Sequence, residues 1–201
     1  IERYVEGLTT QTDPVLAEME RLGEARKFPI VGPQVGRVLY ILTKLLKAKR
    51  IFEMGSGFGY SAYWFAKALP AGGKVYQTET SDTNSRLAED FFTRGGLRKK
   101  SEFLVGDGVK LIEKVKGPFD IIFIDIEKEN YPRAFMQAKR FLRKGGLLVA
   151  DNLLWFGKVL EESDEPDTLG IKEFTRLLFR DSDFFATILP IRDGVGVGYR
   201  L

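Results

Sequence analysis

The sequence predicts an α/β fold in which a seven-stranded, mostly parallel sheet is covered by helices on both faces. Five short apolar runs alternate with longer segments that have helical spacing, and this alternation is typical of β-α-β units. Two further strand-like runs flank Asp193-Gly194 near the C-terminus, where they predict a β-hairpin that completes the sheet.

The strands are assigned to short runs in which apolar side chains dominate. The five expected parallel strands are Arg50–Met54, Lys74–Glu79, Glu102–Val105, Phe119–Asp125 and Gly146–Asp151. The expected hairpin strands are Phe184–Leu189 and Val195–Leu201. Strands that are apolar on both faces are typical of a parallel sheet buried between two layers of helices.

Between the strands, four segments have the length and the apolar spacing that helices require. They are Tyr60–Leu69, Ser81–Arg94, Gly108–Lys116 and Tyr131–Arg143. Gly95-Gly96 and Gly145-Gly146 follow the second and the fourth of these segments, and they indicate where those two helices stop.

Two more helices are expected before the first strand. Asp13-Pro14 supplies a suitable N-cap and first-turn pair for a helix over Val15–Ala25. The segment Gln34–Lys49 places its apolar side chains on one helical face. These side chains are Val35, Val38, Leu39, Leu42, Leu45 and Leu46.

The chain has the length of one domain of ordinary size. Its 201 residues are 44% hydrophobic and 29% charged, a balance typical of soluble globular proteins. No Pro- or Ser-rich linker divides it, so one domain is expected over 1–201, with N-terminal helices over 1–49 and the sheet over 50–201. No apolar run approaches the ~20 residues that span a bilayer, and the polar first residues show no secretory signal. A cytoplasmic protein is therefore expected.

Two absences restrict the chemistry. The chain has no Cys, which excludes disulfides, thiolate nucleophiles and zinc–thiolate sites. It also has no His, the usual general base and the commonest transition-metal ligand. Any bound metal must therefore use oxygen ligands, which favours Mg²⁺, Ca²⁺ or Mn²⁺. Any general base must be Lys, Asp, Glu or Tyr.

The net charge of +3 and the pI of about 9.0 are mildly basic. Basic clusters such as Arg98-Lys99-Lys100 are offset by the acidic stretch Glu161-Glu162-Ser163-Asp164-Glu165. This scattered charge favours solvated faces and helix C-termini over a nucleic-acid interface, although the basic pI is compatible with one.

Each of the five apolar strands ends in an acid or runs directly into one. These acids are Glu53, Glu79, Asp107, Asp125 and Asp151. In open α/β sheets, ligands bind outside the carboxyl ends of the strands. Carboxylates gathered there repel one another unless a ligand or a cation uses them. The row therefore predicts a ligand site at this edge, although Ser81 and Asp107 also have the character of helix N-caps.

A glycine loop, Gly55-Ser56-Gly57-Phe58-Gly59, follows the first strand and opens a helix. Tyr60 stands where a dinucleotide-binding fingerprint requires its third Gly, and Glu53 precedes the loop. S-adenosylmethionine (SAM) carries no phosphate, so a nearby acid suits SAM better than a pyrophosphate. Glu79 is placed to accept hydrogen bonds from two ribose hydroxyls, a device that NAD enzymes share. The loop favours SAM in a Rossmann-like sheet, with NAD as the alternative.

Two further motifs follow the fourth and the fifth strands. Asp125-Ile126-Glu127-Lys128-Glu129-Asn130-Tyr131 has the form D-x-x-K-x-x-Y, and Asp151-Asn152-Leu153-Leu154-Trp155 has the form D-N-x-L-W. Together these motifs resemble those of the cation-dependent O-methyltransferases, the family of catechol and caffeoyl-coenzyme A O-methyltransferases and their bacterial relatives. The likeness runs from about Pro33 to Asp193-Gly194.

The resemblance implies a Rossmann-like class I methyltransferase fold and a set of site residues. It implies that Lys128 and Asp125 are catalytic and that Asp125, Asp151 and Asn152 bind the metal. The implied SAM contacts are Val31, Glu53, Gly55, Ser56, Gly57, Ser61, Glu79, Asp107, Gly108, Asp125 and Glu127. Two carboxylates and one amide oxygen also suit Mg²⁺ on chemical grounds, or another divalent cation such as Mn²⁺ or Ca²⁺. The alternative for Asp151-Asn152 is a helix cap.

The same resemblance implies a catechol-like acceptor, a vicinal dihydroxy aromatic small molecule, with Trp155 and Phe156 as substrate contacts. Phe156 stands where plant relatives carry a polar substrate contact, and Ile126-Glu127 replaces a more usual pair of a small residue and Asp. These departures leave the acceptor open. A tRNA hydroxyuridine is the alternative acceptor, and an NAD-dependent oxidoreductase or a non-catalytic nucleotide sensor is the alternative class. The family also implies a homodimer.

Overall fold

The computed structural model describes residues 4, 7–8 and 12–201. The polar first segment, in which no secretory signal is expected, lies mostly outside the described residues, as does the start of the N-terminal region 1–49. Among the residues that the structure does describe, no helix is both long and apolar enough to cross a membrane.

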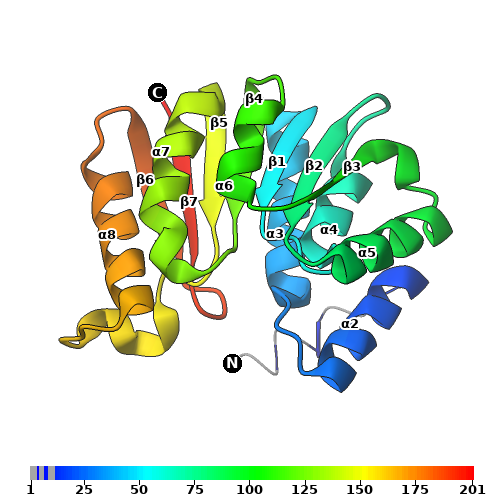
Figure 1. The fold of residues 1–201 in the computed structure, drawn as a ribbon, viewed down its shortest axis with the longest axis horizontal. Helices are drawn as coiled ribbons and strands as arrows, with labels where there is room; N and C mark the ends of the chain where they lie inside the picture. The colour runs from blue at the N-terminus through cyan, green and yellow to red at the C-terminus, as the bar shows by residue number, and fades with distance from the viewer. Residues whose placement is uncertain (1–3, 5–6, 9–11) are drawn as a thin grey trace.

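The described chain forms a seven-stranded sheet with helices on both faces, as predicted (Figure 1). The strands are β1 (Arg50–Met54), β2 (Lys74–Glu79), β3 (Ser101–Val105), β4 (Phe119–Ile124), β5 (Leu142–Ala150), β6 (Phe184–Leu189) and β7 (Val195–Arg200). The α-helices are α2 (Pro14–Arg26), α3 (Gly32–Leu46), α4 (Tyr60–Ala68), α5 (Asp82–Arg94), α6 (Gly108–Leu111), α7 (Tyr131–Phe141) and α8 (Pro166–Arg180). Short 3-10 turns are η1 (Arg98–Lys100), η2 (Ile112–Lys114), η3 (Lys128–Asn130) and η4 (Trp155–Leu160).

The sheet order is β3-β2-β1-β4-β5-β7-β6. The first five strands are parallel, whereas β7 is antiparallel to both β5 and β6. The chain winds outward from β1 to β3 and then returns to β4 beside β1. Ligands of open α/β sheets bind at such a reversal of strand order, outside the carboxyl ends of the strands. The topology therefore places a crevice between the loops that follow β1 and β4.

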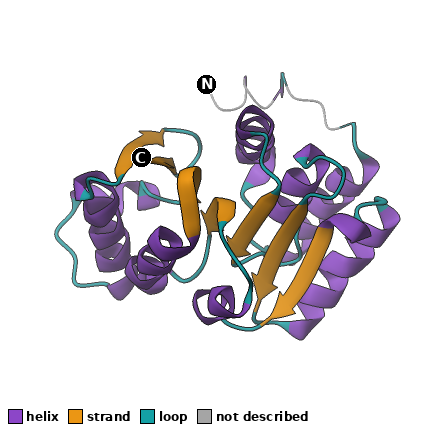
Figure 2. Cartoon of the chain, turned by 90° about the horizontal axis from the view of Figure 1, so that it is seen from above, coloured by secondary structure: helices purple, strands orange, loops and turns teal. Residues whose placement is uncertain are grey.

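Alternation along the central strands divides the core between the two faces of the sheet (Figure 2). In β4, Ile121 and Phe123 belong to the core beneath α3, α4 and α5, while Ile122 and Ile124 belong to the core beneath α7 and α8. All four side chains have no exposed surface. Successive side chains of a strand point to opposite faces, so one apolar run contributes to both cores. The rigid sheet edge that results carries the loops described below.

Helix α8 was not predicted, although its sequence contains helical signals. Pro166 stands in the first turn, and Ile171, Phe174 and Leu178 recur at helical spacing on the face that is buried. These three side chains pack in the same core as α7 and β6. The acidic stretch before the helix is typical of an exposed loop, whereas the apolar spacing that follows it is typical of a helix.

Three other expectations are corrected. Strand β5 begins at Leu142, so Gly145-Gly146 lies inside the strand and does not stop the preceding helix. The helix expected over Gly108–Lys116 is a single α-turn followed by a 3-10 turn. Leu45 of α3 is 76% exposed. The buried face of α3 is instead continued by Thr43, whose hydroxyl donates to the Leu39 carbonyl within the helix.

Candidate active site

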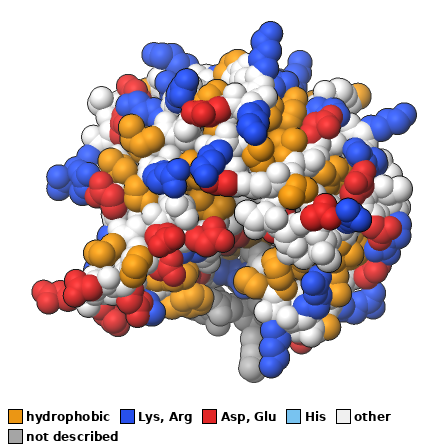
Figure 3. Space-filling view, in the orientation of Figure 1, with side chains coloured by type: hydrophobic (Ala, Val, Ile, Leu, Met, Phe, Trp, Pro, Cys, Tyr) orange, Lys and Arg blue, Asp and Glu red, His pale blue; other side chains and the backbone are white. Residues whose placement is uncertain are grey.

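A cavity of about 1660 Å³ opens at the carboxyl ends of the parallel strands. Single drug-sized ligands occupy pockets of roughly 300–1,000 Å³, so this cavity has room for a nucleoside cofactor and an acceptor together. In the space-filling view, acidic side chains gather beside a hollow in the molecule (Figure 3). The six carboxylates that line the cavity are Glu79, Asp107, Asp125, Glu127, Asp151 and Asp193.

All but one of the residues implied as SAM contacts line this cavity. They are Val31, Gly55, Ser56, Gly57, Ser61, Glu79, Asp107, Gly108, Asp125 and Glu127. The exception is Glu53, which has no exposed surface and lies beneath the glycine loop. The implied metal ligands, Lys128, and the implied substrate contacts Trp155 and Phe156 also line the cavity.

The glycine loop is tightly fitted against the loop that follows β4. Gly55 has a φ of 85°, and a Cβ at this position would lie 2.0 Å from the carbonyl oxygen of Asp125. A Cβ on Gly108 would lie 2.4 Å from the hydroxyl oxygen of Thr78. Only glycine satisfies both the backbone conformation and the close approach at Gly55. The absence of a Cβ lets the glycine loop pack directly against the Asp125 backbone and lets Gly108 pack against the end of β2.

Helix α4 begins directly after the glycine loop with Gly59 at its N-cap, and no side chain caps it. The N–H groups of the first turn of a helix have no partner within the helix and carry partial positive charge. Ser61 lies in this first turn and lines the cavity. The start of α4 can therefore receive an anionic group of a ligand.

Two acids near the cofactor side also have structural roles. Asp107 is the N-cap of α6, where its Oδ1 accepts from the Val109 N–H at 2.9 Å. Glu79 Oε1 accepts from the Ser81 N–H at 2.8 Å, and Ser81 in turn caps α5. The capping character expected for Ser81 and Asp107 is thus present. Both acids still line the cavity and keep oxygen lone pairs for a ligand.

Glu53 is fully buried, and one of its oxygens is unpaired. Its Oε2 accepts from the Ser56 hydroxyl at 2.7 Å, whereas Oε1 has no partner. Burial raises the pKa of Glu53 to about 7, because the charged form loses its hydration. The nearby hydroxyls of Ser61 and Ser56 oppose this increase, and the charges of Asp125 and Glu79 add to it. A ligand cation or donor above the loop would stabilise the ionised form.

Replacing Glu53 by Gln should therefore stabilise the free protein in a pH-dependent way. The raised pKa means that the folded state binds the proton more tightly, so the wild-type protein loses stability as the pH rises from about 4.5 to about 7. The Gln variant lacks this loss and should gain roughly 2–3 kcal/mol over the wild-type protein at pH 8. Urea unfolding at pH 5 and pH 8 measures the difference, with the exposed Glu161→Gln as control. A gain that does not grow with pH would contradict the assignment.

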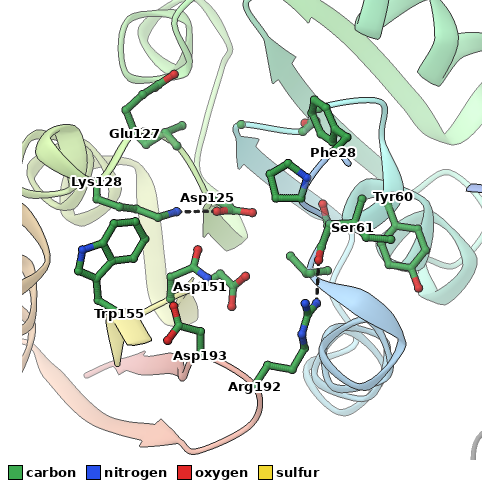
Figure 4. Close-up of a pocket in the computed structure, with 18 of the residues that line it drawn as sticks. Phe28, Tyr60, Ser61, Asp125, Glu127, Lys128, Asp151, Trp155, Arg192 and Asp193 are labelled. Atoms are coloured by element: carbon green, nitrogen blue, oxygen red, sulfur yellow. Dashed lines mark hydrogen bonds and ion pairs between the residues drawn. The ribbon is translucent and has the colours of Figure 1, made fainter. Parts of the chain in front are cut away.

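The carboxylates after β4 and β5 converge on a common space (Figure 4). Burial is the main cause that raises the pKa of Asp151 to about 7, and the charge of Asp125 raises it further. The backbone N–H of Asn152 and the charge of Lys128 act in the opposite direction. A buried acid whose ionisation is disfavoured by a neighbouring carboxylate is suited to sharing a cation with that neighbour.

The donors in this space fit a hard divalent cation. Within the described residues, no three acidic side chains come together closely enough to hold a metal by themselves. A cation between Asp125 and Asp151 would therefore take the Asn152 amide oxygen as its third protein ligand. Asn152 lines the same cavity and has a φ of 60°, a left-handed conformation that Asn tolerates better than most residues.

Lys128 is held deep in the site. Its side chain is 8% exposed, and its Nζ donates to Asp125 Oδ1 at 2.8 Å and to the Tyr131 hydroxyl at 3.0 Å. The Tyr131 hydroxyl lies within donating distance of the carbonyl oxygens of Ile124, at 3.3 Å, and of Asp151, at 3.1 Å. Tyr131 thus connects Lys128 to the ends of both β4 and β5. This contact gives the Tyr of the D-x-x-K-x-x-Y motif a structural role.

Helix α8 supports this arrangement from behind. A Cβ on Gly170 would lie 2.2 Å from the carbonyl oxygen of Lys128. The missing side chain lets α8 pack directly against the backbone of η3. The ring of Phe174, also in α8, meets the ring of Tyr131 edge-on at 5.3 Å between centroids.

Another side of the cavity is formed by η4 and the β6–β7 loop. Trp155 and Phe156 both have left-handed backbones, with φ of 47° and 54°. Asp193 Oδ1 accepts from the Phe156 N–H at 2.6 Å, while Asp193 Oδ2 is buried without a partner. Phe156 is 78% exposed at the rim. The indole nitrogen of Trp155 is likewise buried and unpaired.

Sequence reasoning missed several residues that line the cavity. Phe28, Pro29 and Ile30 come from the connection between α2 and α3, next to the expected Val31. Arg192 and Asp193 come from the β6–β7 loop. Asp193-Gly194 was interpreted only as a hairpin turn, and none of these residues belongs to a motif or follows a parallel strand.

The chain matches the family model described as O-methyltransferase over residues 8–201. It is 37% identical to a catechol O-methyltransferase from Niastella koreensis, over 95% of this chain and 90% of that protein. It is 28% identical to a catechol O-methyltransferase from Mycobacterium tuberculosis, over 94% of this chain and 87% of that protein.

Solved structures give the same result. An O-methyltransferase from Bacillus cereus, in complex with SAH, is 30% identical and superposes with a TM-score of 0.91, covering 100% of this chain and 96% of that one. An O-methyltransferase from Streptomyces achromogenes, in complex with SAM, is 26% identical and superposes with a TM-score of 0.91, covering 99% of this chain and 95% of that one.

Proposed function

Because this chain belongs to the O-methyltransferase family, we propose that it transfers the methyl group of SAM to a hydroxyl of a catechol-like molecule, with the help of a divalent cation. One observation supports this proposal above the others. Lys128, Asp125 and Asp151 converge on one side of a cavity whose other side is the glycine loop. The proposed base, the proposed cation-binding oxygens and the proposed nucleoside site would thus share one cavity.

The cofactor half of the cavity suits SAM. The glycine loop lines the cavity, and the uncapped start of α4 beside Ser61 can receive the carboxylate of the amino-acid moiety. The acids Glu79 and Asp125 line the same cavity and would accept hydrogen bonds from a nucleoside ribose and a cationic amino group. SAM supplies an electrophilic methyl group on its sulfonium, and SAH is the product. No phosphate has to be accommodated, which counts against NAD.

The metal half has the donor chemistry for Mg²⁺. Asp125, Asp151 and Asn152 would hold the cation, whose charge favours the ionised form of a hydroxyl that it binds. Two adjacent hydroxyls on an aromatic ring would suit such a site better than one, which supports a vicinal diol as the acceptor. The apolar faces of Trp155 and Phe156 border this half and suit an aromatic ring.

Lys128 is the residue proposed to receive the proton that leaves the attacking hydroxyl. To accept this proton, Nζ must enter the reaction as the neutral amine, and its contacts with Asp125 and Tyr131 would then hold the ammonium that forms. As the oxygen–carbon bond forms, the carbon–sulfur bond breaks. Holding the oxygen in line with the methyl group and the sulfur is the main task of the cavity, and such orientation can contribute about 7–11 kcal/mol.

The decisive experiment measures methyl transfer from radiolabelled SAM to a panel of acceptors with and without Mg²⁺. The panel contains catechol, a caffeoyl ester, a simple phenol and tRNA that carries an unmethylated hydroxyuridine. We expect transfer to the vicinal diols only, and only with Mg²⁺. Transfer to tRNA alone would show that the proposed acceptor is wrong, while methyl transfer from SAM to a hydroxyl would stand. Binding of NAD instead of SAM in calorimetry would refute the proposal.

A further inference from the structure

Arg192 brings a positive charge into a cavity lined mainly by acids. It lies in the β6–β7 loop, beside Asp193 and across the cavity from Trp155 (Figure 4). Six carboxylates line this cavity, and the only cations that line it within the described chain are Lys128 and Arg192. Lys128 is already paired with Asp125.

Arg192, in contrast, has spare binding capacity. Its Nη1 donates to the carbonyl oxygen of Ile30 at 2.7 Å, and this is its one hydrogen bond to the described residues. No carboxylate of the described chain lies within ion-pair distance of it. A guanidinium carries five N–H donors in a planar fork that matches the two oxygens of a carboxylate. Most of this fork is available to a ligand.

The backbone of Arg192 is also held in an uncommon conformation. Its φ is 50°, in the left-handed region, where a side chain with a Cβ is disfavoured. Such conformations persist where the surrounding structure imposes them, and they gather at ligand sites. The guanidinium reaches across to Gly32, where a Cβ would lie 2.5 Å from Nη1. The side chain therefore has a defined position at the junction of the β6–β7 loop and the start of α3.

We propose that Arg192 binds a carboxylate of the methyl acceptor, so that the enzyme prefers vicinal dihydroxy aromatic acids to neutral diols. This inference rests on the function proposed above and specifies its substrate class. An aromatic acid whose two hydroxyls lie between Asp125 and Asp151 presents the rest of its ring to the walls of the same space, and Arg192 is the one lining cation in the described chain without an acidic partner.

The carboxylate of SAM is the other anion that enters this cavity. The uncapped start of α4 can receive that group without Arg192. Arg192 shares its loop with Asp193, whose Oδ1 accepts from the N–H of Phe156, one of the proposed acceptor contacts. On this ground the proposal assigns the remaining N–H groups of Arg192 to the acceptor.

The test compares two acceptors, 3,4-dihydroxybenzoate and catechol, at saturating SAM and Mg²⁺. For the wild-type enzyme we expect kcat/KM to be higher for the acid. In Arg192→Gln, KM for 3,4-dihydroxybenzoate should rise about tenfold or more, as expected for loss of a charged hydrogen bond. The KM of Arg192→Gln for catechol should change much less. Arg192→Lys keeps the positive charge but loses the two-pronged geometry of the guanidinium. Its KM for 3,4-dihydroxybenzoate should therefore lie between those of the wild type and of Arg192→Gln. The exposed Arg180→Gln, at the end of α8, is the control.

Calorimetry adds a readout that does not need turnover. In the presence of SAH and Mg²⁺, the wild-type protein should bind 3,4-dihydroxybenzoate more tightly than catechol, and Arg192→Gln should remove this difference. SAM binding should persist in the variant, which also shows that the variant is folded. A rise in KM for SAM with both acceptors would assign the carboxylate to the cofactor and overturn the inference.

The failure of this inference can be told apart from a failure of the proposed function. Equal kcat/KM values for the acid and for catechol, with Mg²⁺-dependent transfer to both, would overturn the role of Arg192 alone. No transfer to any diol, and no binding of either diol, would overturn the proposed function and the inference with it.

Discussion

Replacing Lys128 by Met should lower kcat for catechol methylation by about 10²–10⁴-fold, the usual range for loss of a positioned acid–base group. Lys128 Nζ lies 2.8 Å from Asp125 and is nearly buried, so no other described cation can take its place at this position. Met keeps the length and the apolar stem of Lys, which limits the damage to packing. The effect should therefore appear in kcat.

Stopped-flow or steady-state transfer assays measure kcat, and calorimetry measures the Kd for SAM. We expect the Kd to change by less than about threefold, because Lys128 acts on the acceptor. Lys110→Met is the matched control, since Lys110 lies in α6 with a side chain that is 73% exposed. An equal loss of SAM binding and turnover in Lys128→Met would show a structural lysine.

Removing divalent cations with EDTA should abolish methyl transfer to catechol, by at least about 100-fold, and added Mg²⁺ should restore it. The structural reason is the crowding of negative charge around the end of β5. Burial and the neighbouring Asp125 raise the pKa of Asp151. Burial is also the main cause that raises the pKa of Tyr131 well above its ordinary value, and the charges of Asp125, Asp151 and Asp193 add to it. A cation would relieve this repulsion and hold the acceptor.

The metal role has a readout that does not depend on catalysis. Asp151→Asn keeps the shape of the side chain and removes one negative charge, so Mg²⁺ should bind at least about tenfold more weakly to the SAH-bound protein. The exposed Asp164→Asn serves as control. Transfer to catechol that continues unchanged in EDTA would contradict the assignment, whatever the effect of the substitution.

The parallel sheet could be predicted because its strands are buried on both faces. A run such as Phe119–Ile124 has no polar side to obscure it, and each of its apolar residues is needed by one core or the other. Helix α8 shows the limit of this reasoning. Its apolar residues Ile171, Phe174 and Leu178 are separated by polar and charged residues. The acidic stretch before the helix is typical of an exposed loop. The helix is fixed by the tertiary contacts of those three residues.

The site divides in the same way. Asp125 and Asp151 were predictable because they follow strands whose ends share one edge of the sheet. Lys128 was predictable only through its spacing from Asp125, which resembles the family motif. Arg192 and Asp193 reach the cavity from a hairpin loop, and Phe28 reaches it from the segment between α2 and α3. The sequences around these residues predict turns, but they do not predict a contact with a ligand. Which loops fold back over a sheet edge depends on packing that linear spacing does not contain.

Glu53 illustrates a different limit. The sequence correctly places an acid near the end of β1, but a strand that ends at Met54 turns that side chain into the protein and not into the cavity. Position relative to the end of a strand decides between a side chain that touches a ligand and one that lies beneath the loop. Its expected contact with SAM therefore stays a prediction.

The contact between Gly170 and the carbonyl of Lys128 links the base to a helix that touches no ligand. The atom that fixes how far Lys128 projects is backbone, and the space behind it is closed by α8. The placement of Lys128, the proposed base, thus depends on how the last third of the chain has docked. Engineering that grafts only the cavity residues would leave out the helix that fixes this placement.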